Sequence, residues 1–139
     1  SPPDAVQGPE ERMDKELSSL IGIPWLLGGR TRYGCDCLGL ALMAQRDLFG
    51  RVIPDRWQYD GGDFLAMSLR FPEEMLNLGF MEIDKPKDGD VGYLRIAGAG
   101  HLATFISGAH LTITQYTSST WKVRKVPFRW FRPGVTAWQ

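Results

Sequence analysis

The stretch Ile23–Gly50, IPWLLGGRTRYGCDCLGLALMAQRDLFG, decides the fold. It opens with an apolar, extended segment over residues 23–27, and Gly28 and Gly29 then form a turn that leads into a polar loop. From Cys37 onward the apolar residues recur at helical spacing: Leu38, Ala41, Leu42 and Leu48. Gly50 is typical of a residue just past a helix end. The pattern predicts a mostly buried helix that begins at or near Cys37.

The predicted helix start gives Cys37 a chemical setting. First-turn amides have no partner within the helix, and the helix dipole leaves partial positive charge there. A thiolate, which is the nucleophilic form of cysteine, is favoured at such a position. Asp36 suits the N-cap, because its carboxylate can accept a hydrogen bond from a first-turn amide. A small buried cysteine without chemistry is the alternative, and the helix start alone does not decide between the two.

Composition limits the class of protein. The chain has 139 residues, 43% of them hydrophobic and 23% charged, which fits one globular domain with a substantial core. Sixteen Lys and Arg balance sixteen Asp and Glu, so a nucleic-acid partner is not expected. No apolar run reaches the roughly 20 residues of a membrane span, and no signal peptide is visible, so no membrane insertion is expected.

The two cysteines, Cys35 and Cys37, do not make a disulfide framework, and a bridge across one intervening residue is strained. Together with His101 and His110 they could instead ligate zinc. Structural zinc sites space their first cysteine pair by two to four residues, and Cys-x-Cys is tighter. We therefore expect a free thiol and neither a metal nor another cofactor.

The rest of the chain predicts an α+β fold, with N-terminal helices packed on a C-terminal antiparallel sheet. Residues 1–9 form a loose arm, and residues 10–139 form a single domain. Helices are predicted over 10–21 and 63–78, the second capped by Asp63 and divided at Pro72. Turns are predicted at 85–90, 98–100 and 107–108. Strands are predicted over residues 80–83, 91–96, 101–106, 110–116, 121–126 and 128–131.

A cysteine nucleophile needs a base within reach, and the base needs an orienting partner. His101 opens a predicted strand directly after a glycine-rich turn, which places an imidazole at a sheet edge that a helix start could face. Taken without context, such a histidine is a partly exposed surface residue. For the orienting partner we select Gln115, whose side-chain carbonyl can accept from an imidazole N–H. Thr114 and His110 are the alternatives.

These residues, in this order, resemble the NlpC-type family of bacterial cell-wall cysteine peptidases. Pro24-Trp25, Gly28-Gly29 and Asp36-Cys37-Leu38-Gly39-Leu40 match the family pattern around its nucleophile, except that Leu38 stands where Ser is usual. Gly89-Asp90 and the segment His101-Leu102-Ala103-Thr104-Phe105 match the later elements, with Ala103 in place of the usual Gly. The variant Asp-Cys-Leu-Gly-Leu is similar to tail-associated peptidases of phages and gene-transfer agents.

The resemblance implies a papain-like fold in which Cys37 attacks an amide and His101 acts as acid and base. It implies a peptidoglycan stem peptide as substrate, cleaved between D-γ-glutamate and a diamino acid. Trp25 and Asp36 match positions that line the family's substrate pocket, and Asp36 could bind the stem's free amine. The oxyanion would be held by the Cys37 backbone N–H and a second donor near Trp25. The setting implied is a virion tail with other phage tail proteins as partners, or the bacterial cell wall and periplasm.

Several alternatives remain open at this stage. The domain could be a structural tail component of the same fold without activity, although a scaffold has no need for Cys37 and His101 together. It could also catalyse another acyl transfer, such as transglutamination or deamidation. Trp57 and Tyr59 could form a substrate wall or cover the core. Arg30 and Arg32 could meet stem carboxylates or remain solvated loop residues.

Overall fold

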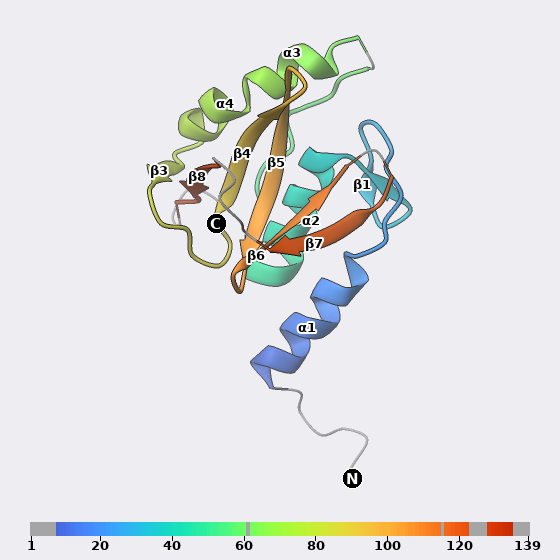
Figure 1. Ribbon diagram of the computed structural model, residues 1–139, viewed down its shortest axis with the longest axis vertical. Helices are drawn as coiled ribbons and strands as arrows, with labels where there is room; N and C mark the ends of the chain where they lie inside the picture. Colours follow the sequence, from blue (N-terminus) through green and yellow to red (C-terminus); the bar gives the residue numbers. More distant parts are fainter. Residues whose placement is uncertain (1–7, 61, 115, 123–127, 135–139) are drawn as a thin grey trace.

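A computed structural model describes residues 8–60, 62–114, 116–122 and 128–134. It confirms the α+β fold, with the helices first and an antiparallel sheet after them (Figure 1). The predicted arm over residues 1–9 falls largely outside the described residues, and the single domain over 10–139 stays a prediction. The elements are α1 (Pro9–Ser19), β1 (Arg30–Thr31), β2 (Gly34–Cys35), α2 (Cys37–Phe49), α3 (Phe64–Leu69), α4 (Phe71–Asn77), β3 (Met81–Ile83), β4 (Val91–Ile96), β5 (Ala99–Ile106), β6 (Ala109–Ile113), β7 (Ser118–Lys122) and β8 (Arg129–Arg132).

The main sheet has the strand order β3-β8-β4-β5-β6-β7, and every neighbouring pair is antiparallel. The β4–β5 hairpin turns at Ala97 and Gly98, with φ of 50° and 82°. Two successive positive φ values match the sense of twist of a two-residue hairpin. The predicted turn at 98–100 is therefore one residue late, and β5 begins at Ala99, two residues before the predicted strand start at His101.

Helix α2 is the central buried helix. Its predicted start and stop are both confirmed: it runs Cys37–Phe49, and Gly50 adopts the left-handed conformation at φ 66°. The first turn lies against the loop before it, since a Cβ added to Gly39 would stand 2.0 Å from the carbonyl oxygen of Gly29. The helix packs on the sheet through a shared apolar core that includes Leu40, Met43, Leu102, Leu111 and Phe131.

The region after α2 also follows the predicted pattern. The predicted division of the helical stretch 63–78 into two pieces is confirmed as α3 and α4, but the break falls at Arg70, and Pro72 lies in the first turn of α4. Proline is tolerated there because first-turn amides have no helical partner. Asp63 precedes α3 but makes no side-chain capping hydrogen bond. These two helices lie over one end of the sheet, beside β4 and β5 (Figure 1).

The Gly89-Asp90 element has a structural role. Gly89 has a φ of 91°, and its carbonyl accepts from the Gln45 side chain at 2.8 Å. Asp90 is 2% exposed and accepts two hydrogen bonds from Arg132, at 3.0 and 2.8 Å. This buried carboxylate ties the turn before β4 to the strand β8. In the described part of the chain, no helix has the length and apolarity to cross a membrane.

Candidate active site

Cys37 is the first residue of α2, and Asp36 is its N-cap, as predicted. The Asp36 backbone is extended, and its carboxylate accepts from the Gly39 amide at 2.8 Å. The cap satisfies a first-turn donor that the helix itself cannot satisfy. Cys37 is thereby held at a fixed point facing the sheet.

The Asp36 carboxylate is occupied by the protein itself. It is 0% exposed, and it accepts from the Gly28 amide at 2.8 Å, from the Tyr59 hydroxyl and from Arg30 Nη1 at 3.1 Å. A buried carboxylate needs such partners, because its charge is costly to remove from water. No face of it remains open for a substrate amine. The predicted substrate-binding role of Asp36 therefore does not fit this geometry, and its role is to hold the helix start in place.

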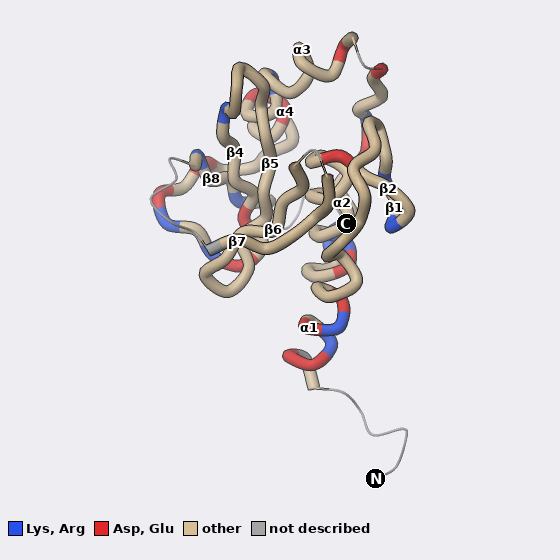
Figure 2. The backbone as a smooth tube through the Cα atoms, turned by 45° about the vertical axis from the view of Figure 1, so that its right-hand side comes forward, with Lys and Arg blue, Asp and Glu red and all other residues tan. Residues whose placement is uncertain are grey.

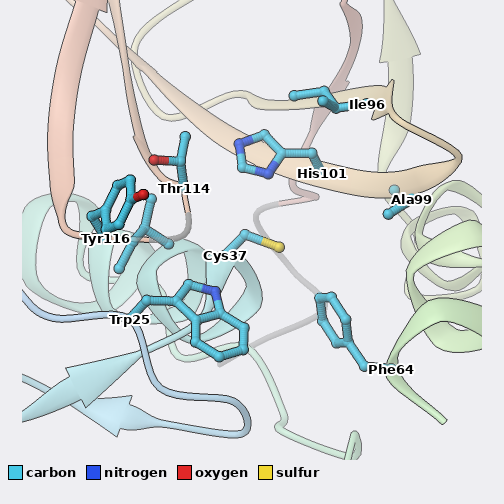
Figure 3. Close-up of a pocket in the computed structure, with 10 residues that line it drawn as sticks. Trp25, Cys37, Phe64, Ile96, Ala99, His101, Thr114 and Tyr116 are labelled. Carbon is cyan, nitrogen blue, oxygen red and sulfur yellow. The ribbon is translucent and has the colours of Figure 1, made fainter. Parts of the chain in front are cut away.

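A pocket of about 620 Å³ brings Cys37 and His101 together (Figure 3). The two residues are distant in the sequence, and they meet because the start of α2 packs against the first residues of β5. Trp25, predicted to bind substrate, lies in the same lining and is 39% exposed. The described residues that line the pocket are Trp25, Cys37, Phe64, Ile96, Ala99, Gly100, His101, Ile113, Thr114 and Tyr116.

His101 has a hydrogen-bond partner that the sequence reasoning missed. Its Nε2 is bonded to the hydroxyl of Thr112, and that hydroxyl also donates to the Leu102 carbonyl at 2.8 Å. A threonine hydroxyl has one hydrogen, so its bond to His101 must be accepted from Nε2–H. This places a proton on Nε2, so that in the neutral imidazole Nδ1 is the acceptor. The arrangement is that of a general base and its orienting partner.

The three residues predicted as candidates for the orienting partner of His101 lie in different places. Gln115 lies outside the described residues, so its assignment stays a prediction. Thr114 lines the pocket, one residue past the end of β6. His110 is buried, and its ring packs edge-on against Phe128 at 5.0 Å between centroids. In the sequence, Thr112 and Thr114 alternate with apolar residues, which places both on one face of the predicted strand. This pattern does not indicate which of the two threonines reaches His101.

The resting pair of Cys37 and His101 is neutral. Burial, the largest cause, raises the pKa of the Cys37 thiol to about 12; the Asp36 charge adds to this, and hydrogen bonding to the Leu102 backbone opposes it. Burial, followed by the proximity of His110, lowers the pKa of His101 to about 4. The pKa shift runs against the prediction that the helix start favours the thiolate, because burial outweighs the backbone hydrogen bonds of Leu102, Leu38 and Cys37. The imidazole must then take the thiol proton as the attack proceeds.

The other cysteine has no place in the pocket lining. Cys35 is 0% exposed, burial raises the pKa of its thiol to about 12, and both cysteines are free. Among the described residues, no group of three or more His, Cys, Asp and Glu side chains could hold a metal ion. The zinc alternative of Cys35, Cys37, His101 and His110 therefore gains no support there.

The loop residues considered at the sequence level have structural contacts. Trp57 is 7% exposed and belongs to the core. Tyr59 packs against Phe64 with 5.1 Å between ring centroids, so Phe64 rather than Tyr59 lines the pocket. Arg30 binds Asp55 at 2.9 Å in addition to Asp36. Arg32 pairs with two acids, Glu16 at 3.4 Å and Asp47 at 3.0 Å. Both arginines are therefore engaged within the protein.

Comparison with solved structures identifies the class of fold. The chain matches the NlpC/p60 domain of the peptidoglycan hydrolase SagA with a TM-score of 0.60 and 19% identity, over 92% of this chain and 100% of that one. It also matches an NlpC/p60 family protein from Bacillus cereus with a TM-score of 0.55 and 16% identity, over 91% of this chain and 40% of that one. No protein-family model matches the sequence, and no curated protein sequence is significantly similar. The fold is thus that of NlpC/p60 domains.

Proposed function

We propose that this protein is a cysteine peptidase that hydrolyses peptidoglycan. One observation carries the proposal: Cys37, the first residue of α2, and His101, the third residue of β5, line one pocket. Thr112 holds the histidine with Nδ1 as acceptor, which completes the set of nucleophile, base and orienter. The likeness in fold to a domain of a peptidoglycan hydrolase supports the choice of substrate.

The proposed reaction is acyl transfer through Cys37. The Sγ–H proton moves to Nδ1 of His101 while Sγ forms a bond to the amide carbonyl carbon. Collapse of the tetrahedral intermediate breaks the C–N bond, and His101 returns the proton to the leaving amine. Water, deprotonated by the same nitrogen, then hydrolyses the thioester. The Cys37 amide, at the positive end of α2, and the indole N–H of Trp25 are the donors proposed for the oxyanion.

We propose the bond between D-γ-glutamate and the diamino acid of the stem as the one cleaved. The support is the match of Trp25, Cys37 and His101 to the NlpC-type pattern. The Asp-Cys-Leu-Gly-Leu variant further supports a tail-associated peptidase of a phage or gene-transfer agent, acting on the host wall. Other tail proteins would then be its partners.

Digestion of purified peptidoglycan tests the proposal. Wild type and Cys37→Ala are incubated with walls of several diamino-acid types, and the muropeptides are identified by mass spectrometry. New fragments ending at γ-glutamate, seen only with wild type, are expected. Cys35→Ser is the matched control, because that thiol is not among the residues that line the pocket, and it should retain the activity. Absence of new fragments from every wall type would contradict the proposal.

A second candidate, an inactive structural component of the same fold, has one observation in its favour. Cys37 is only 4% exposed, and the resting pair carries no charge. A third possibility is acyl transfer to an amine instead of water. Adding a primary amine to the digestion separates these cases, since a transferase forms an amide adduct, a hydrolase forms the acid, and a scaffold forms neither.

A further inference from the structure

The pocket that holds Cys37 and His101 has no charged side chain among the described residues that line it, apart from the titratable pair itself. Neither β5 nor β6, which supply much of the lining, contains an acid, a lysine or an arginine, and both appear as uncharged tubes in Figure 2. Gln115, between Thr114 and Tyr116 in the sequence, also has an uncharged side chain.

The mouth of the pocket is apolar as well. Trp25, Ile96 and Tyr116 are 39%, 49% and 72% exposed, and all three belong to the lining. Large apolar side chains exposed together around a concave site mark a binding surface. Here they surround the reactive sulfur, so whatever covers them also lies beside the scissile bond.

The two arginines shortly before the start of α2 are already paired with acids of the protein. Arg30 is bound to Asp36 and Asp55, and Arg32 is bound to Glu16 and Asp47. The Asp36 carboxylate raises the pKa of the adjacent Cys37 thiol, which means that it also disfavours other negative charge at the sulfur. A carboxylate brought beside the sulfur would lose its hydration and find no cation in the lining.

We propose that the pocket selects an acyl donor that is uncharged around the scissile carbonyl. This inference rests on the proposed function, and within a stem peptide it selects the form whose glutamate bears an α-carboxamide over the form with a free α-carboxylate. A carboxamide offers two donors and an acceptor to polar groups such as the Thr114 and Tyr116 hydroxyls without the desolvation cost of a charge. The residues of the aromatic and apolar rim contact its uncharged atoms.

Two synthetic stems that differ only in this group test the inference. Both carry the same γ-glutamyl–diamino acid bond, one with the α-carboxamide and one with the α-carboxylate. The kcat/KM of wild type is expected to be at least tenfold higher for the carboxamide. Equal values, or a preference for the carboxylate, would overturn the inference.

A second pair of reagents keeps the inference testable if neither stem is cleaved. Iodoacetamide and iodoacetate alkylate a thiol by the same displacement, forming an S–C bond and releasing iodide, and differ in charge alone. The ratio of the iodoacetamide rate to the iodoacetate rate at Cys37, measured in Cys35→Ser, is expected to exceed the same ratio for free N-acetylcysteine at least tenfold.

Ile96→Lys, added to Cys35→Ser, places a cation at the mouth of the pocket and should bring this ratio back toward the value for the free thiol. A ratio in Cys35→Ser no higher than that of N-acetylcysteine would overturn the inference. A high ratio without stem cleavage would overturn the proposed peptidase function and leave the selectivity standing.

Discussion

Replacing Thr112 with valine should slow the reaction without preventing folding. The substitution keeps the shape of the side chain and removes the hydroxyl that accepts from His101 Nε2 and donates to the Leu102 carbonyl at 2.8 Å. Each buried partner left unpaired costs about 1–3 kcal/mol. Loss of the hydrogen bond to the Leu102 carbonyl lowers the stability of the fold. Loss of the hydrogen bond to His101 lowers the rate, because the imidazole is then free to rotate or to carry its proton on Nδ1. With a proton on Nδ1, that nitrogen cannot act as the base.

A penalty of about 1–3 kcal/mol at the base corresponds to a loss of roughly 5- to 150-fold in kcat, with KM unchanged. The assay is turnover of a stem peptide, with unfolding in urea measured in parallel. Thr112→Ser retains the hydroxyl and should restore most of the rate. Thr104→Val is the matched control, because Thr104 is a buried threonine of β5 that is not among the residues lining the pocket. The reasoning is refuted if folded Thr112→Val keeps its kcat within twofold of wild type, or if Thr104→Val loses as much activity.

Three further predictions concern the frame of the site. Gly39→Ala should lower the free energy of unfolding by about 1–3 kcal/mol in urea titration, since the new methyl would overlap the Gly29 carbonyl; an unchanged midpoint would contradict the close approach. Tyr59→Phe should cost about 1–3 kcal/mol by the same measurement, because it removes a donor to the buried Asp36 carboxylate, and a neutral result would mean that water replaces it. The pKa of His101 is lowered from 6.5 to about 4, so the unfolded chain binds the extra proton between these values and stability should fall as pH drops from 6.5 to 4. Comparison of wild type with His101→Gln isolates that contribution, which should be absent in the variant.

Local signals in the sequence were sufficient to predict the start and end of α2 and the break between the two helices that follow it. The start of α2 was predictable because a capping aspartate, a helical apolar stripe and a terminal glycine are all adjacent to the helix they define. The break near Pro72 was predictable for the same reason. The pairing of Cys37 with His101 came from the ordered motifs and not from periodicity, because nothing local relates a helix start to a strand sixty-four residues away in the sequence.

The remaining features depend on tertiary contacts that a pattern does not contain. The Asp36 carboxylate is fully hydrogen-bonded because the segment after α2 brings Tyr59 to it and β1 brings Arg30, and neither contact follows from the residues next to Asp36. Thr112 reaches His101 although the ladder register places Thr114 opposite that residue, and the recorded β5–β6 pairs stop at Thr104 and Leu111. Which threonine reaches the imidazole is thus decided by how the two strands part beyond these pairs.

The protonation state of Cys37 and His101 depends on their burial, which the sequence pattern does not contain. It leads to a prediction about the mechanism. Burial raises the pKa of the Cys37 thiol to about 12 and lowers the pKa of the His101 imidazole to about 4, so burial favours the neutral pair over the ion pair in the empty site. The proton is then expected to move as Sγ attacks. Alkylation of Cys37 by iodoacetamide should rise steadily with pH from 6 to 10, without the plateau near neutrality that a stable ion pair produces. Cys35→Ser confines the label to one thiol, and a plateau below pH 8 that disappears in His101→Gln would refute the neutral pair.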